Sequence, residues 1–360
     1  MFERIPSLRD RAPRRAHAPR SLTRGRFCAV LAGAAYGAAA PDQITIAYQA
    51  AGGTSWPLFI GQLGGYYKKY GFDAQPMLAA YPGGVTMLVD GQAGMLVGGL
   101  QQLLPIAARD GSLAAIGGMM NRSTFSLIAS RDVPSVQGLK RKRIAVGQVG
   151  DSTYGYLIAV LKDAGLSDRD VDLIPVGPDP AARAAALASG RADATLLFSP
   201  ASFRMEDAGY KNLADLAAYQ NIFTTVAYWV RKAILSSKPD WGERLIQAHA
   251  EAIRRFYDDR SFAIQSYLAY NKEATPADVA RTYDQYSRLQ LFERVPYVLQ
   301  PAVAAALDQQ AGAARNQTSD FRGNIDNSLV DRLVKQNFFV NVFGSSLRAE
   351  QDTKSRLAFR

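Results

Sequence analysis

The first 200 residues of the chain contain the same order of elements twice, and this repeat restricts the possible fold more than any other feature. Each copy has an apolar strand, a turn rich in Gly, Ser and Thr, a helix, a second strand, a helix end with glycine, and a third strand. The matching segments are 44–47 and 143–146, 58–67 and 154–161, 88–93 and 187–192, and 95–97 and 194–198. A single helix that ends in glycine before a strand occurs in many α/β proteins. Several elements that recur in the same order at offsets of 94 to 100 residues instead favour a duplicated β-α-β-α-β unit.

This duplication predicts an α/β fold with two lobes, each a mainly parallel sheet flanked by helices. Parallel β-α-β units gather their ligand-facing loops at the carboxyl ends of the strands. Four loops are expected to meet there, at 52–56, 98–100, 150–154 and 198–200. Because two such units that face each other enclose a space, we expect a ligand cleft between the lobes.

Two extended segments are expected to connect the lobes and to act as a hinge. Residues 116–130 lead into the second lobe and residues 223–230 lead back. After residue 231 the apolar pattern becomes helical. The expected division is a first lobe of residues 41–123 plus 229–345 with a helical C-terminal part, a second lobe of residues 124–228, and a polar tail of residues 346–360.

Residues 1–40 have the pattern of a signal peptide. Arginines up to Arg26 precede an apolar stretch from Phe27 to Ala40 that ends in small residues. Its roughly 13 mildly apolar residues are fewer than the about 20 that span a bilayer. We therefore expect cleavage near residue 40 and a periplasmic mature protein, with the choice between general secretory and twin-arginine export left open.

The basic balance of the chain lies mostly in this leader. Eight of the 42 Lys and Arg residues and two of the 32 Asp and Glu residues precede residue 41, so +6 of the formal charge of +10 lies there and +4 remains. Nucleic-acid binding thereby loses its main support. The basic run 140–143, just ahead of an apolar strand, is interpreted as a solvated turn.

The mature chain lacks the residues that most catalytic and metal sites use. Cys28 and His17 lie in the leader, so after residue 40 there is no cysteine and the only histidine is His249. Thiol nucleophiles, disulfides and sites with several histidine ligands are therefore excluded, and neither a metal nor a cofactor is expected. His249 lies between Leu245 and Ile253 at four-residue spacing in a helical pattern, which favours a core histidine.

A family resemblance is carried by the leader and by segments 44–47, 64–72, 91–94, 138–146 and 190–194. Together these segments resemble the extracytoplasmic solute-binding proteins of ABC importers, most closely the nitrate, taurine and sulfonate type, which is similar to the NMT1/THI5-like domain. The resemblance covers roughly residues 43 to 230. It implies a two-lobed type II periplasmic-binding-protein fold that closes on its ligand and docks on a membrane permease. By position, it implies ligand contacts from Ser55, Trp56, Gly98, Gly99, Asn121, Ser152, Thr153 and Ser199.

Three side chains near this expected site have two interpretations each. Trp56 either stacks on a ligand or covers the start of its helix. Tyr154 shares a helical face with Leu157 and Leu161, which favours packing over ligand contact. Arg122 either lies on the surface or points inward as a bidentate partner for a carboxylate or sulfonate. Asp151, beside the glycine-rich turn, would repel an anion unless it turns away to cap the helix.

The sequence therefore predicts a monomeric solute receptor of an importer. Its partners are expected to be a small organic anion or heteroaromatic molecule and an ABC permease, and not nucleic acid. Two alternatives stay open: a pyrimidine enzyme of the thiamine-precursor type on the same fold, and a ligand-sensing subunit for a membrane receptor.

Overall fold

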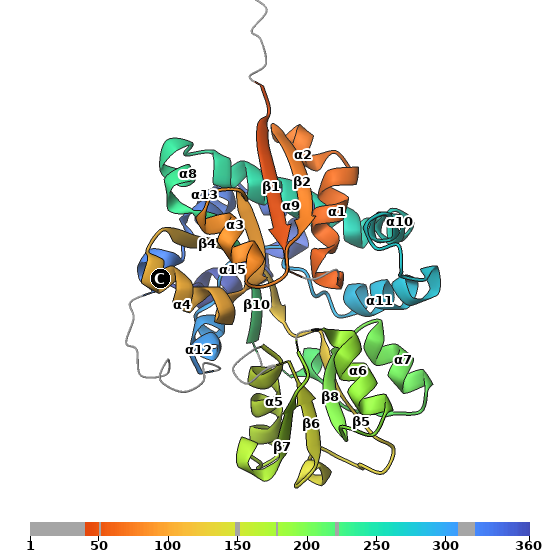
Figure 1. Cartoon of the computed structure of the whole chain (residues 1–360). Helices are drawn as coiled ribbons and strands as arrows, with labels where there is room; N and C mark the ends of the chain where they lie inside the picture. Colours follow the sequence, from red (N-terminus) through yellow and green to blue (C-terminus); the bar gives the residue numbers. More distant parts are fainter. Residues whose placement is uncertain (1–39, 50–51, 148–151, 178, 220–222, 309–320) are drawn as a thin grey trace, which may run out of the picture. The chain divides into compact units, whose positions relative to one another are not determined.

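The first of two sheets contains five strands in the order β2-β1-β3-β10-β4 (Figure 1). The computed structural model describes residues 40–49, 52–147, 152–177, 179–219, 223–308 and 321–360. The strands are β1 (Asp42–Tyr48), β2 (Phe72–Leu78), β3 (Met95–Gly99), β4 (Leu113–Arg122) and β10 (Phe223–Arg231). Strands β1, β2 and β3 are parallel, and β10 is antiparallel to both of its neighbours. Ile44 and Ile46 pack into one core and Ala47 into the other, as the alternation of side chains along a strand requires.

The second sheet repeats this arrangement with the order β7-β6-β8-β5-β9. Its strands are β5 (Phe125–Ala129), β6 (Arg143–Val146), β7 (Asp172–Pro175), β8 (Ala194–Phe198) and β9 (Lys211–Asp215). Strands β6, β7 and β8 are parallel, and β5 is antiparallel to its neighbours. The place of β10 in the first sheet is thus taken by β5 in the second.

The matching strand orders confirm the predicted duplication. Strands β1, β2 and β3 correspond to β6, β7 and β8, and in both sheets the fourth position is filled by a strand, β10 or β5, that lies outside this three-strand unit in the sequence. Gly91 and Gly190, 99 residues apart, end equivalent helices with φ of 78° and 70°. Only glycine adopts such values without a steric penalty, which explains why both copies keep glycine there.

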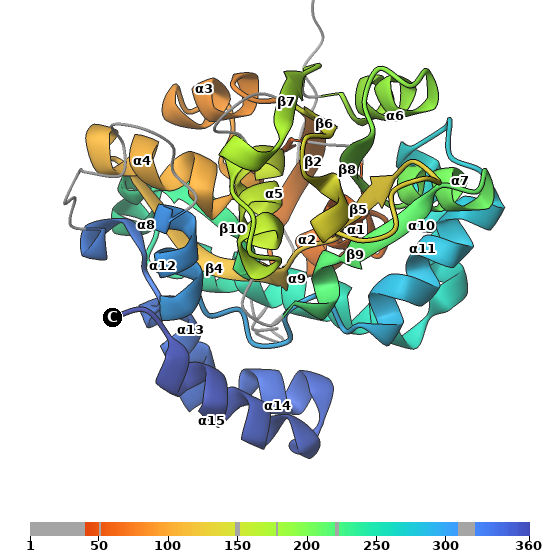
Figure 2. The ribbon, with the colours of Figure 1, turned by 90° about the horizontal axis from the view of Figure 1, so that it is seen from below.

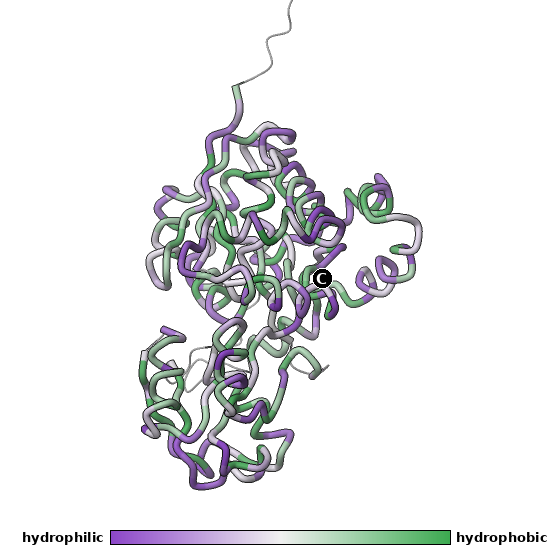
Figure 3. Tube along the Cα trace, turned by 90° about the vertical axis from the view of Figure 1, so that its right-hand side faces the viewer, coloured by the Kyte–Doolittle hydropathy of each residue, from purple (hydrophilic) through white to green (hydrophobic). Residues whose placement is uncertain are grey.

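Helices cover both faces of each sheet. Those in the two repeated units are α1 (Trp56–Leu63), α2 (Tyr66–Lys69), α3 (Gly83–Val89), α4 (Leu100–Asp110), α5 (Ser152–Asp163), α6 (Pro180–Ala188) and α7 (Ala201–Asp207). On strand β5, Leu127 packs into the core beneath α5, while Ile128 packs into a smaller core with Leu187 of α6 and Met205 of α7. Figure 3 colours the trace by hydropathy; the strand residues that pack into these cores, such as Leu127 and Ile128, are hydrophobic and buried.

The C-terminal third is helical, as predicted, and packs against the first sheet. It consists of α8 (Lys232–Ser237), α9 (Trp241–Asp258), α10 (Arg260–Tyr270), α11 (Pro276–Arg288), α12 (Gln300–Asp308), α13 (Ser328–Lys335), α14 (Phe338–Phe343) and α15 (Arg348–Leu357). Helices α9 and α10 pack on α1, and α11 lies beside α10 (Figure 2). None of the helices in the described ranges has the length and apolarity needed to cross a bilayer.

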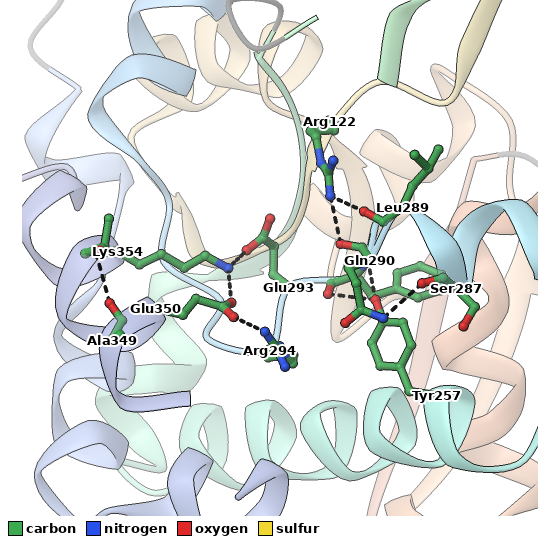
Figure 4. A network of polar contacts seen from close by, with 12 residues as sticks. Arg122, Tyr257, Ser287, Leu289, Gln290, Glu293, Arg294, Ala349, Glu350 and Lys354 are labelled. Carbon is green, nitrogen blue, oxygen red and sulfur yellow. Dashed lines mark hydrogen bonds and ion pairs between the residues drawn. The ribbon is translucent and has the colours of Figure 1, made fainter. Parts of the chain in front are cut away.

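The chain after α11 runs along the outer edge of β4 and is held there by a partly buried charge network (Figure 4). The backbone N–H of Glu293 donates to the carbonyl of Met119 at 2.8 Å. Lys354 of α15 forms ion pairs with Glu293 and, at 2.6 Å, with Glu350, and Glu350 also pairs with Arg294. Burial alone would lower the pKa of Lys354, but the two carboxylates more than offset it and leave that pKa above its ordinary value.

Two expected boundaries differ from the structure. Strand β10 pairs with the first sheet from Phe223 onward, so the expected lobe boundary at residue 228 falls inside a strand. Residues 346–360, expected to be a polar tail, instead include α15, with Leu347 and Ala358 buried and the backbone of Phe359 bonded to Val298. The polar composition of that segment did not indicate a helix, because α15 packs through only a few apolar residues and through ion pairs.

Candidate functional site

The predicted contacts from the first lobe lie at the carboxyl ends of its strands. Gly98 and Gly99 end β3, and Gly99 precedes α4 without any side-chain cap at that helix end. Ser55 is buried at the start of α1, and Asn121 is buried next to the last residue of β4. The first backbone N–H groups of α4 lack intrahelical partners, as in any helix, so they can serve as donors to a ligand.

Trp56 is a core residue, so its expected role in stacking on a ligand is wrong. Its side chain has no exposed surface, and its indole N–H donates to the carbonyl of Ala263 at 2.6 Å. Four aromatic rings from the C-terminal helices surround it, with centroids 4.7 to 6.1 Å away. The rings are those of Phe256, Tyr267, Tyr283 and Tyr286. The alternative interpretation, in which Trp56 covers the start of its helix, fits this packing.

Arg122 does not offer a bidentate partner to a ligand. Its guanidinium Nη2 donates to the carbonyl of Leu289 and, at 3.2 Å, to that of Gln290 (Figure 4). These two residues follow the last turn of α11, where carbonyl groups lack intrahelical partners and attract a cation. Arg122 therefore fixes the end of β4 to the end of α11.

The second lobe contributes a different set of groups. Ser152 begins α5, but its side chain and the preceding turn 148–151 with Asp151 lie outside the described residues. Thr153 is buried, and its Oγ1 accepts from the backbone N–H of Gly147 at 2.9 Å, which fixes the start of the turn. The hydroxyl of Tyr154 donates to Asp168 at 3.0 Å, so it is held at the exposed side of the lobe.

Ser199 is the second-lobe residue best placed for a ligand. It directly follows β8, its side chain is buried, and its Oγ has no hydrogen-bond partner among the described residues. A buried hydroxyl without a partner costs free energy, which a bound solute or water would recover.

Contacts between groups of the two lobes occur beside Ser199, and sequence patterns did not predict them. A Cβ added at Gly52 would lie 3.2 Å from the ring of Phe198, so the loop after β1 lies directly against this ring. Gln101 of α4 donates through Nε2 to the hydroxyl of Tyr156 of α5 at 2.9 Å. The ring of Phe125 lies between those of Phe198 and Tyr156, with centroid distances of 5.4 Å and 5.5 Å. These three rings of the second lobe therefore form one wall.

Two further polar groups of the first lobe were also missed. Gln49 directly follows β1, and its amide Nε2 is buried without a hydrogen-bond partner among the described residues. Tyr286 of α11 is fully buried, its ring lies within 2.7 Å of a Cβ added at Gly53, and burial raises its pKa. A glutamine after a strand gives no strong signal in the sequence. The contact between Tyr286 and Gly53 joins residues 233 positions apart, which no local pattern reveals.

The site is thus lined by neutral hydrogen-bonding groups and aromatic rings. Among the described residues, no cluster of three or more His, Cys, Asp or Glu side chains has the arrangement of a metal site. His249 lies elsewhere, in the core of the first lobe, as predicted. It is 1 % exposed, its Nε2 is 3.2 Å from the hydroxyl of Tyr67, and burial lowers its pKa to about 3.

Proteins of known structure share this fold at low sequence identity. The periplasmic sulfonate-binding protein SsuA from Methylobacillus flagellatus KT is 20 % identical, with a TM-score of 0.66 over 83 % of this chain and 96 % of its own. The aliphatic sulphonate binding protein SsuA from Escherichia coli is 18 % identical, with a TM-score of 0.63 over 79 % and 92 %. The desulfurization enzyme DSZB is 16 % identical, with a TM-score of 0.63 over 82 % and 99 %.

These likenesses confirm the predicted two-lobed binding-protein fold, which an enzyme also uses. No curated protein matches the chain at a significant level. The family model described as NMT1/THI5 like matches residues 54–260. Because this match spans more than half of the sequence, the chain belongs to the NMT1/THI5-like family.

Proposed function

We propose that the chain is the extracytoplasmic solute-binding component of an ABC-type importer, which captures a small organic molecule between its lobes and delivers it to a membrane permease. The observation that carries this proposal is the approach of Gly52 to the ring of Phe198 beside the buried hydroxyl of Ser199. A solute held there touches both lobes, so its binding stabilises the closed arrangement. The sulfonate-binding proteins that share the fold support the same role.

The proposed ligand is a small organic molecule with oxygen acceptors and a flat or apolar body. Donors for the acceptors are the amide of Gln49, the hydroxyl of Ser199 and the first backbone N–H groups of α4. Ser55, Gly98, Asn121, Ser152 and Thr153 remain proposed contacts around them. The wall of Phe125, Tyr156 and Phe198 accommodates the body of the ligand. With Arg122 bound to backbone carbonyls, an anion would be held by N–H and O–H groups.

A ligand screen by thermal unfolding tests this proposal. The protein from residue 41 onward is heated with sulfonates, carboxylates and pyrimidines, and a solute that binds only the folded state raises the melting temperature. For the best compound, Gln49→Ala and Ser199→Ala are each expected to weaken binding about tenfold by calorimetry, because each removes one buried hydrogen bond. Gln43→Ala is the matched control, since Gln43 is exposed at the opposite end of the same strand.

Three results would contradict the proposal. One is the absence of any melting shift across the panel, and another is equal affinity of all three variants and the unsubstituted protein. The third is chemical conversion of the bound compound, followed by mass spectrometry, which would favour the enzymatic alternative that the fold of DSZB keeps open.

A further inference from the structure

Helices α7 of the second lobe and α11 of the first lobe lie side by side (Figures 1 and 2). Ion pairs between their charged side chains join the two helices. Arg204 of α7 contacts Asp278 of α11 through Nε at 3.1 Å and Nη2 at 2.5 Å. In the opposite direction, Arg281 of α11 contacts both carboxylate oxygens of Asp207 at 2.9 Å and lies 3.6 Å from Glu206. Each helix therefore contributes one arginine, and each also contributes an aspartate that pairs with the arginine of the other helix.

The acidic residues at the end of α7 do not stabilise this helix by themselves. Glu206 and Asp207 are in its last turn, where the helix dipole disfavours negative charge. Arg281 compensates both, and its guanidinium also lies 4.1 Å from the centroid of the Phe203 ring, a cation–π contact. On α11 the acceptor is fixed in place, because Thr275 Oγ1 donates to the same Asp278 oxygen at 2.9 Å.

We propose that these contacts form an ionic latch that keeps the two lobes closed in the absence of ligand. The latch consists of Phe203, Arg204, Glu206 and Asp207 of α7 and of Asp278 and Arg281 of α11. Apart from these pairs, α7 packs mainly against β5, β8, β9 and α6 of the second lobe, and α11 mainly against α10 and the turn at 53–55 of the first lobe. The latch pairs therefore exist only when the lobes are closed. Because the side chains of Arg281 and Asp207 are 44 % and 67 % exposed, salt weakens their attraction and shifts the lobes toward the open state.

The size of the effect follows from the kind of contact. One exposed ion pair changes an equilibrium constant by up to about fivefold. The three ion pairs formed by the two arginines, reinforced by a ring contact, are expected to shift the ratio of closed to open protein by about tenfold. This shift does not depend on the proposed ligand, so ligand-free protein tests it separately from the proposed function.

The test measures the distance between the lobes in ligand-free protein by single-molecule fluorescence. Since the chain after residue 40 has no cysteine, Lys68→Cys on α2 and Lys162→Cys on α5 give two specific labelling positions. We expect the closed fraction to fall about tenfold relative to the open one in Arg281→Asp. The double exchange Arg281→Asp with Asp207→Arg restores an opposite-charge pair and is expected to recover most of the closed fraction.

The matched control is Arg260→Asp. Arg260 pairs with Asp284 of α11 at 2.9 Å with similar exposure, but both residues belong to the first lobe. This control is expected to leave the lobe distance unchanged, and circular dichroism establishes that each variant is folded. An equal closed fraction in Arg281→Asp and the control overturns the latch. So does a lobe distance of the unsubstituted protein that is the same in dilute buffer and in high salt.

Discussion

At the scale of single residues, burial of His249 makes the stability of the protein depend on pH. Burial lowers its pKa from the ordinary 6.5 to about 3 in the folded state. Below about pH 6.5 the unfolded chain binds a proton at His249, whereas the folded chain does not. The free energy of unfolding therefore falls by about 1.4 kcal/mol per pH unit down to about pH 3. We expect urea unfolding of His249→Gln to show a shallower loss between about pH 6.5 and 5. Equal slopes in both proteins would show that His249 does not titrate as inferred.

Single residues also mark the limit of what the sequence predicts. Spacing placed Trp56 and Arg122 at the ends of the correct elements, yet it did not predict where their side chains point. Their hydrogen-bond partners, Ala263 and Leu289, are 207 and 167 residues away. Packing against C-terminal helices fixes both side chains, and no local sequence pattern predicts where those helices lie. His249, in contrast, lies in a regular helical pattern, and its burial was predicted correctly.

At the scale of elements, the docking of α15 depends on Lys354. Its side chain and that of Glu293 are only 17 % and 11 % exposed, so removing the cation leaves the poorly hydrated Glu293 carboxylate without its ion-pair partner. We expect Lys354→Ala to lower the free energy of unfolding by about 3 kcal/mol in urea titrations. Arg356→Ala on the exposed side of the same helix is the control and is expected to change it by less than about 0.5 kcal/mol. A similar small effect of both substitutions would mean that α15 is held by other contacts.

Elements of the repeated units were predictable, because strands, glycine caps and turns are local signals. The same argument failed for residues 346–360, where α15 is mostly polar. It packs through the two flanking residues Leu347 and Ala358 and through ion pairs to a distant segment. Patterns of apolar residues do not reveal an element that is held mainly by charge.

At the scale of the whole molecule, a short connection joins the two lobes. Strand β4 ends at Arg122 and β5 begins at Phe125, so only Ser123 and Thr124 separate a strand of one sheet from a strand of the other. The division into two similar halves could be predicted from the repeat. The contacts that hold the halves together could not, because they join positions that the repeat does not relate.

Closure brings the loop after β1 against the second lobe, and Gly52 is the residue that allows it. Its φ of −121° suits any residue, so the only obstacle to a side chain is the Phe198 ring, 3.2 Å from an added Cβ. The branched side chain of Gly52→Val is expected to hold Phe198 away, to enlarge the radius of gyration in solution X-ray scattering, and to weaken ligand binding at least about tenfold. Gly83→Val is the control, since an added Cβ there meets no atom within 4 Å. A radius of gyration in Gly52→Val equal to that of the control would show that the ring yields without opening the lobes.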